Sequence, residues 1–280
     1  MYNSLVIHII FLMYTIRDFC TKLFAQSFFD TGIHLTPFSV YHIAYMVLIF
    51  GGITLLWLML RQKSQHKQVE ALRILAYLLV FSYLSDFFFH DFVYGSLNLD
   101  KLPFHLCTVL CPVIAMAQFR RNGQKIAEPV GVLAILCSLM YLCYPASVGT
   151  GEPWCYQTVQ TMFYHGLLLA WGSLTFAFGI IKPHIRHIWK CGVALVLITL
   201  WAKLGNLTYG DYNWFFLEED ALYIGLVGDG ILPKWSLMII NPVVFLLAAL
   251  ALYGVLHGIR ACSQKHTAIQ LNAVTPQSAV

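Results

Sequence analysis

The sequence predicts an all-α membrane protein, a polytopic bundle of about seven spanning helices. Hydrophobic residues make up 59% of the 280 residues and charged residues 11%, and the mean hydropathy is +0.70. No soluble class of this length has such a composition. A spanning helix needs about 20 mostly apolar residues. Seven apolar stretches have roughly that length, the third being short enough that we expect it to begin at the membrane interface: residues 38–60, 72–94, 104–119, 127–145, 157–181, 187–206 and 236–258.

The N-terminal segment differs from these stretches. Leu5 to Ile16 is apolar over only about a dozen residues, and Arg17, Asp18 and Lys22 follow it. The segment has no basic start and no small residues at its end, which a signal peptide would have. We therefore expect residues 1–36 to form an interfacial helix, with an eighth span as the open alternative. Residues 37–262 are then the membrane domain, and residues 263–280 are predicted to be a disordered cytoplasmic tail.

The basic residues predict the orientation. With the first span running inward, twelve of the seventeen Lys and Arg residues fall on one side of the membrane. The positive-inside rule makes that side cytoplasmic, so the N-terminal segment is outside and the C-terminus is inside. The net charge of +4 is therefore a signal of orientation, and no loop has the long basic patch that nucleic-acid binding needs. The twelve are Arg61, Lys63, Lys67, Arg73, Arg120, Arg121, Lys125, Lys182, Arg186, Lys190, Arg260 and Lys265.

Polar residues within the predicted spans gather toward the outer side. Ionisable residues in spans normally face one another or a water-filled cavity, so this distribution predicts an outward-opening cavity. A histidine in a span is often only a hydrogen-bonded packing residue, and a lone cysteine is usually a small apolar one, so structural roles stay open for each. The candidate site residues are Asp86, His90, His105, Cys107, Thr161, His165, Asn206 and Asn213.

We expect no resident metal or cofactor. His105, His165 and Asp86 have the ligand types of a zinc site, but the chain lacks the spacings H-E-x-x-H and C-x-x-C. Cys143 and Cys155 flank a short outer loop, and they could form a disulfide or remain two buried thiols.

Three segments carry a resemblance to a known family. Leu102-Pro103-Phe104-His105-Leu106-Cys107 resembles the Leu-Pro-x-His-Leu-Cys signature of the bacterial YwaF-like integral membrane proteins, which are related to the eukaryotic transmembrane protein 164 family. Phe163-Tyr164-His165-Gly166-Leu167 is similar to the family's intramembrane histidine segment. Asn206 with Gly210 to Leu217 resembles its Asn…Gly-x-Asn-Tyr-x-Phe-Leu segment, although Trp214 stands where the family usually has Tyr.

The resemblance implies phospholipid acyl transfer that uses a cysteine in the region where the third span begins. The family's cysteine is expected beside the motif histidine, where this chain has Phe104, and Cys107 lies two residues beyond His105. Both a thioester on Cys107 and a direct, base-assisted transfer therefore stay open. Membrane phospholipids or lysophospholipids would be the partners, and the bacterial inner membrane would be the location.

The residues by themselves also fit this chemistry. Acyl transfer needs a nucleophile, a base and donors for the developing oxyanion, at the depth of the lipid ester groups. We assign Cys107, His165 and His105 as catalytic candidates, and Asp86, Asn206 and Asn213 as orienting, oxyanion or headgroup residues. A lipid hydrolase would use the same groups. The alternatives are a seven-span sensor, ligand-binding or assembly protein without catalysis, and a small-solute transporter.

Overall fold

The prediction of an all-α fold is confirmed. The computed structural model describes residues 2–24, 31–145, 151–210, 212–218 and 232–274, and across those residues every regular element is a helix. The α-helices are α1 (Tyr2–Phe24), α2 (Val40–Leu60), α3 (Gln65–Tyr94), α4 (Leu106–Phe119), α5 (Gln124–Cys143), α6 (Tyr156–Ala177), α7 (Ile188–Tyr209) and α9 (Lys234–Val274). Short 3-10 turns are η1 (Leu99–Lys101), η3 (Ile185–His187) and η4 (Trp214–Phe216).

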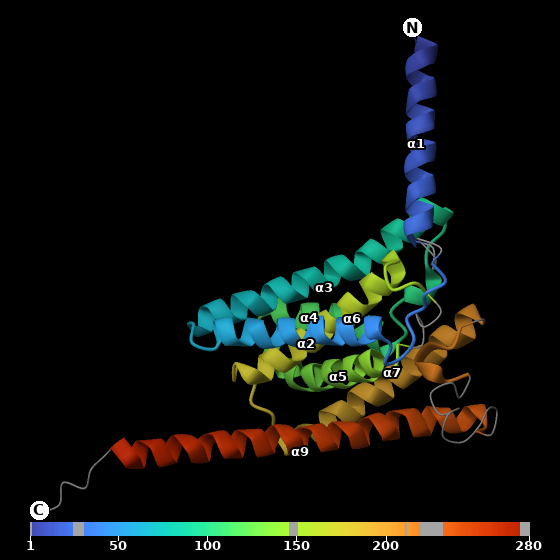
Figure 1. Cartoon of the computed structure of the whole chain (residues 1–280). Coiled ribbons are helices and arrows are strands. Elements are labelled where there is room, and N and C mark those ends of the chain that lie inside the picture. The colour runs from blue at the N-terminus through green and yellow to red at the C-terminus, as the bar shows by residue number, and fades with distance from the viewer. Residues whose placement is uncertain (1, 25–30, 146–150, 211, 219–231, 275–280) are drawn as a thin grey trace, which may run out of the picture.

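The seven helices from α2 to α9 form the bundle, and each falls on one of the predicted apolar stretches (Figure 1). Five helical segments of the described chain are long and apolar enough to cross a membrane: Val40–Leu60, Gln65–Val93, Gln124–Cys143, Ile185–Tyr209 and Lys234–Ala261. Helix α4 has only 14 residues, and α6 is long enough but carries polar residues through its first half. Seven spans and their orientation therefore stay predictions.

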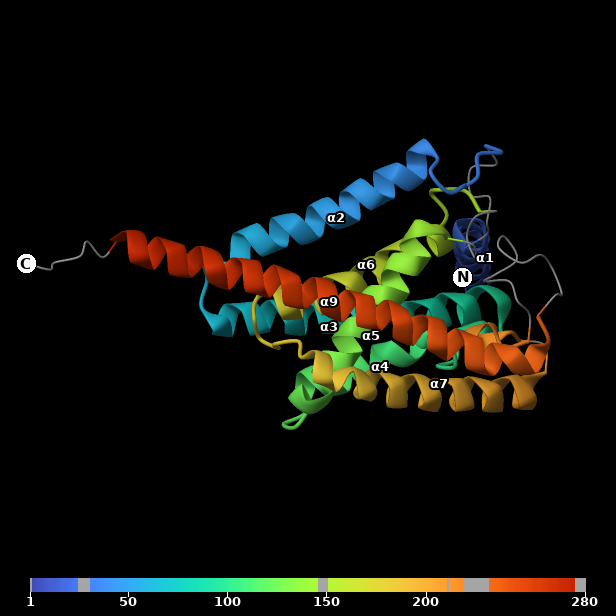
Figure 2. The same cartoon turned by 90° about the horizontal axis from the view of Figure 1, so that it is seen from below.

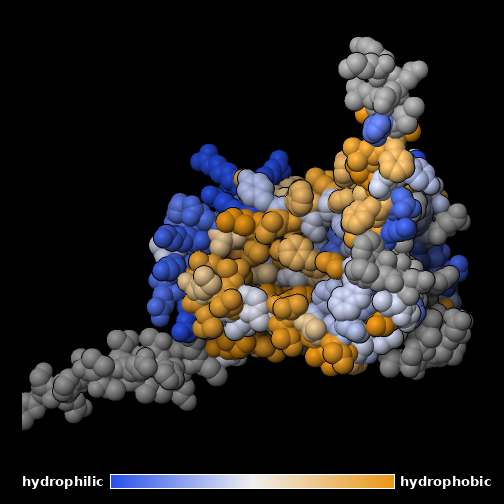
Figure 3. All heavy atoms as spheres, turned by 45° about the horizontal axis from the view of Figure 1, so that its top comes forward, coloured by the Kyte–Doolittle hydropathy of each residue, from blue (hydrophilic) through white to orange (hydrophobic). Residues whose placement is uncertain are grey.

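The chain is an integral membrane protein. Apolar side chains cover the middle of the face that Figure 3 shows, and hydrophilic side chains lie toward its ends. Burial divides the helices between core and lipid: two thirds of the most apolar stretch of α5 is buried inside the protein, whereas none of that of α2 is. Helix α2 lies apart from α3 and α9 at one side of the bundle (Figure 2), so its apolar surface faces lipid.

Helix α1 leaves the bundle and runs roughly perpendicular to the bundle helices (Figure 1). An interfacial helix beside spanning helices would have this orientation. The Arg17 side chain links the end of α1 to α3, because its Nη2 donates to the Val93 carbonyl oxygen at 3.4 Å. At the other end of the chain, α9 continues as a helix to Val274, so the segment predicted to be a disordered tail from residue 263 begins as a helix.

Close packing of α5 against α6 sets the geometry of the site. A Cβ atom built on Gly172 would lie 2.8 Å from the backbone oxygen of Gly131, so only glycine lets the two backbones approach this closely. We call the end of the bundle where α4 and α6 begin its outer end, following the predicted orientation, and the opposite end its inner end. Cys137 lies six residues outward of Gly131 on α5, and His165 lies seven residues outward of Gly172 on α6. These two side chains are therefore at similar depths.

Candidate functional site

His165 is a rigidly held, buried histidine near the middle of α6. Its Nδ1 lies 2.9 Å from the carbonyl oxygen of Thr161. A carbonyl oxygen can only accept, so Nδ1 carries the hydrogen and Nε2 keeps a free lone pair. The ring stacks on Tyr141 of α5 with centroids 3.8 Å apart and planes 8° apart, and only 4% of the residue is exposed. His165 is therefore prepared to act through Nε2, as a base or as a metal ligand.

Cys107 lies in the first turn of α4 and meets His165 and Cys137. The two sulfur atoms and a ring nitrogen of His165 all lie within 4.8 Å of one another. Tyr164 holds the turn in place, because its hydroxyl donates to the Cys107 carbonyl oxygen at 2.8 Å. A thiol and an imidazole are the two groups that nucleophilic catalysis by cysteine pairs, and here they lie close enough for a small movement to bring them into hydrogen-bond reach.

Cys137 was not singled out from the sequence, although a signal for it exists. Helices α4 and α5 form a hairpin with a short inner turn. Cys107 lies twelve residues before the end of α4, and Cys137 lies thirteen residues after the start of α5. Nearly equal distances from the turn give similar depths in an antiparallel pair. Hydropathy alone did not single out Cys137, because a cysteine counts as one more apolar residue in a hydropathy profile.

These three residues are also the group of His, Cys, Asp or Glu in the described chain that could hold a metal ion. Two thiolates and an imidazole suit a soft ion such as zinc. The set considered from the sequence, His105, His165 and Asp86, is not brought together in this way. The ligand types of the observed set are equally those of a cysteine nucleophile with its base.

A small cavity of about 40 Å³ lies beside Cys107 and His165. It exceeds the roughly 10–15 Å³ that a water molecule needs, so it has room for a water or for a small polar group. The residues that line it are Tyr83, Asp86, Lys101, Cys107, Thr108, Gln160, Thr161, Tyr164 and His165.

Asp86 is the acidic group of this cavity. It is 1% exposed, and its Oδ2 accepts a hydrogen bond from Asn98 Nδ2 at 3.0 Å. Its Oδ1 is buried and has no hydrogen-bond partner among the described residues. A buried carboxylate oxygen without a partner is costly, so it marks a place where a donor from water or substrate would be stabilised. Lys101 lines the same cavity.

His105, Asn206 and Asn213 do not line this cavity; they hold the segment 212–218. Asn206 pairs with the Trp214 backbone twice, donating to its oxygen at 3.2 Å and accepting from its N–H at 2.9 Å. His105 Nδ1 accepts from the Phe215 N–H at 3.2 Å, and Asn213 Oδ1 accepts from the Glu218 N–H at 2.8 Å. Their predicted catalytic and oxyanion roles stay predictions, and the structure gives each of them a structural task.

Two other residues considered from the sequence have local roles. His90 Nδ1 donates to the Ser96 carbonyl oxygen at 2.7 Å, just past the end of α3. Cys143 and Cys155 are both free thiols, so the disulfide alternative is wrong for this structure. Cys155 instead interacts with the Thr158 hydroxyl at 3.1 Å. Glu219 and Asp220, which follow the segment 212–218 and are expected on the outer side of the membrane, lie outside the described residues.

These features define a helical integral membrane protein in which a buried histidine meets a half-buried cysteine near one end of the bundle. A family model, described as the TMEM164 family, matches residues 37–253. The chain therefore belongs to the TMEM164 family, which confirms the resemblance found in its motifs. The match covers α2 to α7 and about half of α9, and so includes every residue of the site. No curated protein and no solved structure gives a match.

Proposed function

We propose that this protein is a phospholipid acyltransferase in which Cys107 is the nucleophile and His165 is its base. The observation that carries the proposal is the contact between the Cys107 thiol and the His165 imidazole within 4.8 Å, with Nδ1 of that ring occupied by the Thr161 carbonyl. The fixed tautomer leaves Nε2 as the nitrogen that can take the thiol proton. The resemblance to bacterial YwaF-like proteins favours the inner membrane of a bacterium as the location.

The reaction balances with these two residues. Nε2 takes the proton of Cys107, and the thiolate attacks the ester carbonyl carbon of a phospholipid. The tetrahedral intermediate collapses to a thioester on Cys107, and the departing lysophospholipid oxygen takes the proton from His165. A second lysophospholipid hydroxyl then loses its proton to His165 and attacks the thioester. The new ester leaves, the thiolate recovers the proton, and the enzyme is regenerated. Water as the acceptor would make the protein a lipid hydrolase.

Other residues of the cavity have assignable parts in this proposal. The unpartnered Oδ1 of Asp86 is suited to accept a hydrogen bond from the acceptor hydroxyl and so to orient it. Lys101 brings a cationic group to the same space, where a headgroup phosphate or a developing oxyanion would be stabilised. The cavity admits a reacting ester group but no acyl chain, so the acyl chains would stay in the bilayer between the helices.

The geometry gives less support to the alternatives. A transporter needs a polar path through the bundle, and the cavity lined by Cys107 and His165 has a volume of only about 40 Å³. A sensor or assembly protein needs no nucleophile and no base. A sensor or assembly function would therefore not account for the proximity of Cys107 and His165.

The test uses purified protein in lipid nanodiscs with isotope-labelled phospholipid and unlabelled lysophospholipid. We expect transfer of label, and an acyl adduct on Cys107 by mass spectrometry. His165→Ala should lower the rate by at least about 100-fold, which is the lower range for loss of a general base. Cys107→Ala separates the mechanisms, because retained transfer would point to direct, base-assisted attack.

Cys191→Ala is the matched control, because Cys191 is a buried cysteine of α7 that packs near Tyr253 and away from the site. It should transfer label at the wild-type rate. Neither transfer nor hydrolysis with several headgroups, from protein that remains folded, would contradict the enzyme and favour the sensor.

A further inference from the structure

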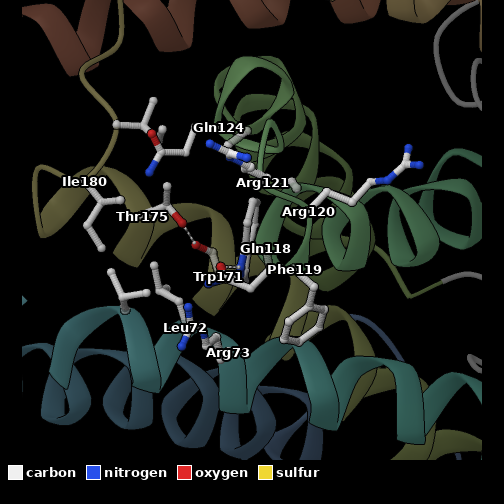
Figure 4. A pocket seen from close by; sticks show the side chains of 14 residues that line it. Leu72, Arg73, Gln118, Phe119, Arg120, Arg121, Gln124, Trp171, Thr175 and Ile180 are labelled. Carbon is white, nitrogen blue, oxygen red and sulfur yellow. Dashed lines mark hydrogen bonds between the residues drawn. The ribbon is translucent and has the colours of Figure 1, made fainter. Parts of the chain in front are cut away.

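A second and larger cavity opens at the inner end of the bundle, far from Cys107. Its volume is about 280 Å³, and it lies between the start of α3, the turn from α4 to α5, and the end of α6 (Figure 4). Ala117 in its wall is ten residues along α4 from Cys107, which is roughly 15 Å at 1.5 Å per residue. The two cavities are therefore separate sites.

The charged residues of this cavity are all cationic. Arg73 of α3 and Arg121 of the turn after α4 approach from opposite sides (Figure 4), and Arg120 also lines it. The lining contains no acidic residue. Within the described chain, none of the three guanidinium groups has a carboxylate within 4.0 Å. Arg73 and Arg121 thus bring two positive charges to one space without a counter-charge, and Arg120 lines its edge with its side chain extending away (Figure 4).

The acidic residues that are near in sequence are occupied elsewhere. Glu70, one turn before Arg73, pairs with His66 at 3.5 Å. Glu128 of α5 accepts from the His184 N–H at 2.7 Å, and it pairs with His187 at 2.6 Å. Neither carboxylate is directed at the cavity, so the protein itself does not neutralise the three arginines.

Neutral donors add to the attraction for an anion. Trp171 Nε1–H donates to Gln118 Oε1 at 3.1 Å and holds that amide at the wall. Helix α5 begins at Gln124, also in the wall, with no side chain capping its N-terminus and no acidic residue in its first turn. The start of a helix carries a partial positive charge, which favours an anion there.

We propose that this cavity binds a phosphate group. Guanidinium groups present paired N–H donors that match phosphate oxygens, and a phosphate can meet donors from several sides at once. Phe119, Ile180 and Ile181 complete the wall, so the bound group is a phosphate ester that carries an apolar part. The headgroup of an anionic phospholipid is the source that the membrane offers, and a soluble phosphate ester is the other source of the same chemistry.

Arginines at this end also follow the positive-inside pattern, which by itself needs no ligand. The cavity distinguishes phosphate binding from a role in orientation alone. Arg61 stacks over Trp57 with its guanidinium carbon 5.0 Å from the ring centroid, and Arg186 lies in η3. Both are exposed at the same end of the bundle, and neither lines the cavity. Variants at Arg61 and Arg186 are matched controls, because they remove positive charge from the same end of the bundle without changing the lining of the cavity.

The experiment measures bound lipid by native mass spectrometry, and the thermal midpoint of unfolding, in nanodiscs of phosphatidylcholine with or without phosphatidylglycerol. A separate arm adds glycerol 3-phosphate in detergent. The pocket variant is Arg73→Gln with Arg121→Gln, and the control is Arg61→Gln with Arg186→Gln. We expect the wild type and the control to retain phosphatidylglycerol, and the pocket variant to bind it at least about ten-fold more weakly, as befits lost charge-assisted hydrogen bonds.

Binding of phosphatidylglycerol without glycerol 3-phosphate would identify the lipid headgroup, and binding of both would show that the phosphate ester suffices. Equal binding by the pocket variant and the wild type, or equal loss in the control, would overturn the proposal. Arg73→Lys with Arg121→Lys tests for a folding defect, because it keeps the charge and should restore part of the binding. Cys107→Ala should bind as the wild type does, so the outcome does not depend on the proposed acyl transfer.

Discussion

The chemistry assigned to His165 depends on the backbone beneath it. The Thr161 carbonyl fixes the hydrogen on Nδ1, and Tyr141 covers one face of the ring. The remaining nitrogen is the one that can take a proton, and the Cys107 thiol is among the groups close to the ring. Cys137 completes the group from α5, and its thiol is a weak donor that can approach the Cys107 sulfur. We therefore expect Cys137 to be a positioning residue that stabilises the thiolate of Cys107.

Cys137→Ala should lower the rate of acyl transfer by about ten-fold, the effect of losing one weak hydrogen bond to a charged group. Cys137→Ser keeps a donor of similar size and should recover most of the rate. The measurement is the initial rate of label transfer in nanodiscs at saturating lipid.

A purely structural role predicts a different result for Cys137. The small cavity left by alanine would then lower the midpoint of thermal unfolding, and the serine variant, with a buried hydroxyl, would be no better than alanine. Equal rates for wild type and Cys137→Ala would show that Cys107 and His165 act without it.

At the level of the element, the segment 212–218 has a strained backbone that is held by hydrogen bonds from three helices. Phe215 and Phe216 have φ values of 56° and 54°, in the left-handed region that aromatic residues rarely adopt. Asn206 of α7 and His105 at the start of α4 bind its backbone N–H groups. Asn241 of α9 donates to the oxygens of Phe215 and Phe216 at 2.8 and 2.9 Å. These bonds offset the strain and connect three helices near the site.

Gly205 lets this segment pack against α7. A Cβ atom there would lie 2.6 Å from the Phe104 ring and 2.9 Å from the Trp214 ring. Gly205→Ala should therefore destabilise the protein by about 1–3 kcal/mol, the usual cost of overpacking a core. Gly192→Ala in the same helix is the matched control, because its nearest neighbours, in Leu246, lie at 3.8 and 3.9 Å.

The measurement is unfolding in detergent by denaturant, followed by tryptophan fluorescence. The control should be unchanged or slightly more stable, since alanine favours a helix over glycine by up to about 1 kcal/mol. Equal stability of the two variants would mean that the aromatic rings move aside at little cost.

Across the whole molecule, the sequence predicted the positions of the helices far better than their contacts. Apolar runs marked α2, α3, α5, α7 and α9, since length and hydropathy are properties of a single segment. The meeting of Asp86, Cys107 and His165 at one cavity also followed from their shared depth. Depth was not enough for Asn206, because the rotation of its helix decides which neighbour the side chain meets, or for Asn213, because it lies in a non-helical segment after α7.

Two parts of the molecule were not predicted from the sequence. Cys137 and Asn241 lie in apolar helices, where one small or polar residue does not disturb the pattern. The arginine-lined cavity at the inner end was hidden for another reason. Arg73, Arg120 and Arg121 served as evidence of orientation, and only packing of four helix ends shows that they share a space.

The orientation of the whole bundle decides which leaflet supplies the substrate, and cysteine labelling can measure it. In a background with Cys20 and Cys143 replaced by serine, Ser96→Cys just beyond α3 should react with a membrane-impermeant maleimide added to intact cells. Lys63→Cys, between α2 and α3, should react only after the membrane is opened, because the positive-inside rule places it in the cytoplasm. Both positions are exposed in the structure, so accessibility of the side chain does not limit either reaction. The reverse pattern would place Cys107 and His165 at the cytoplasmic leaflet and the arginine-lined cavity at the outer one.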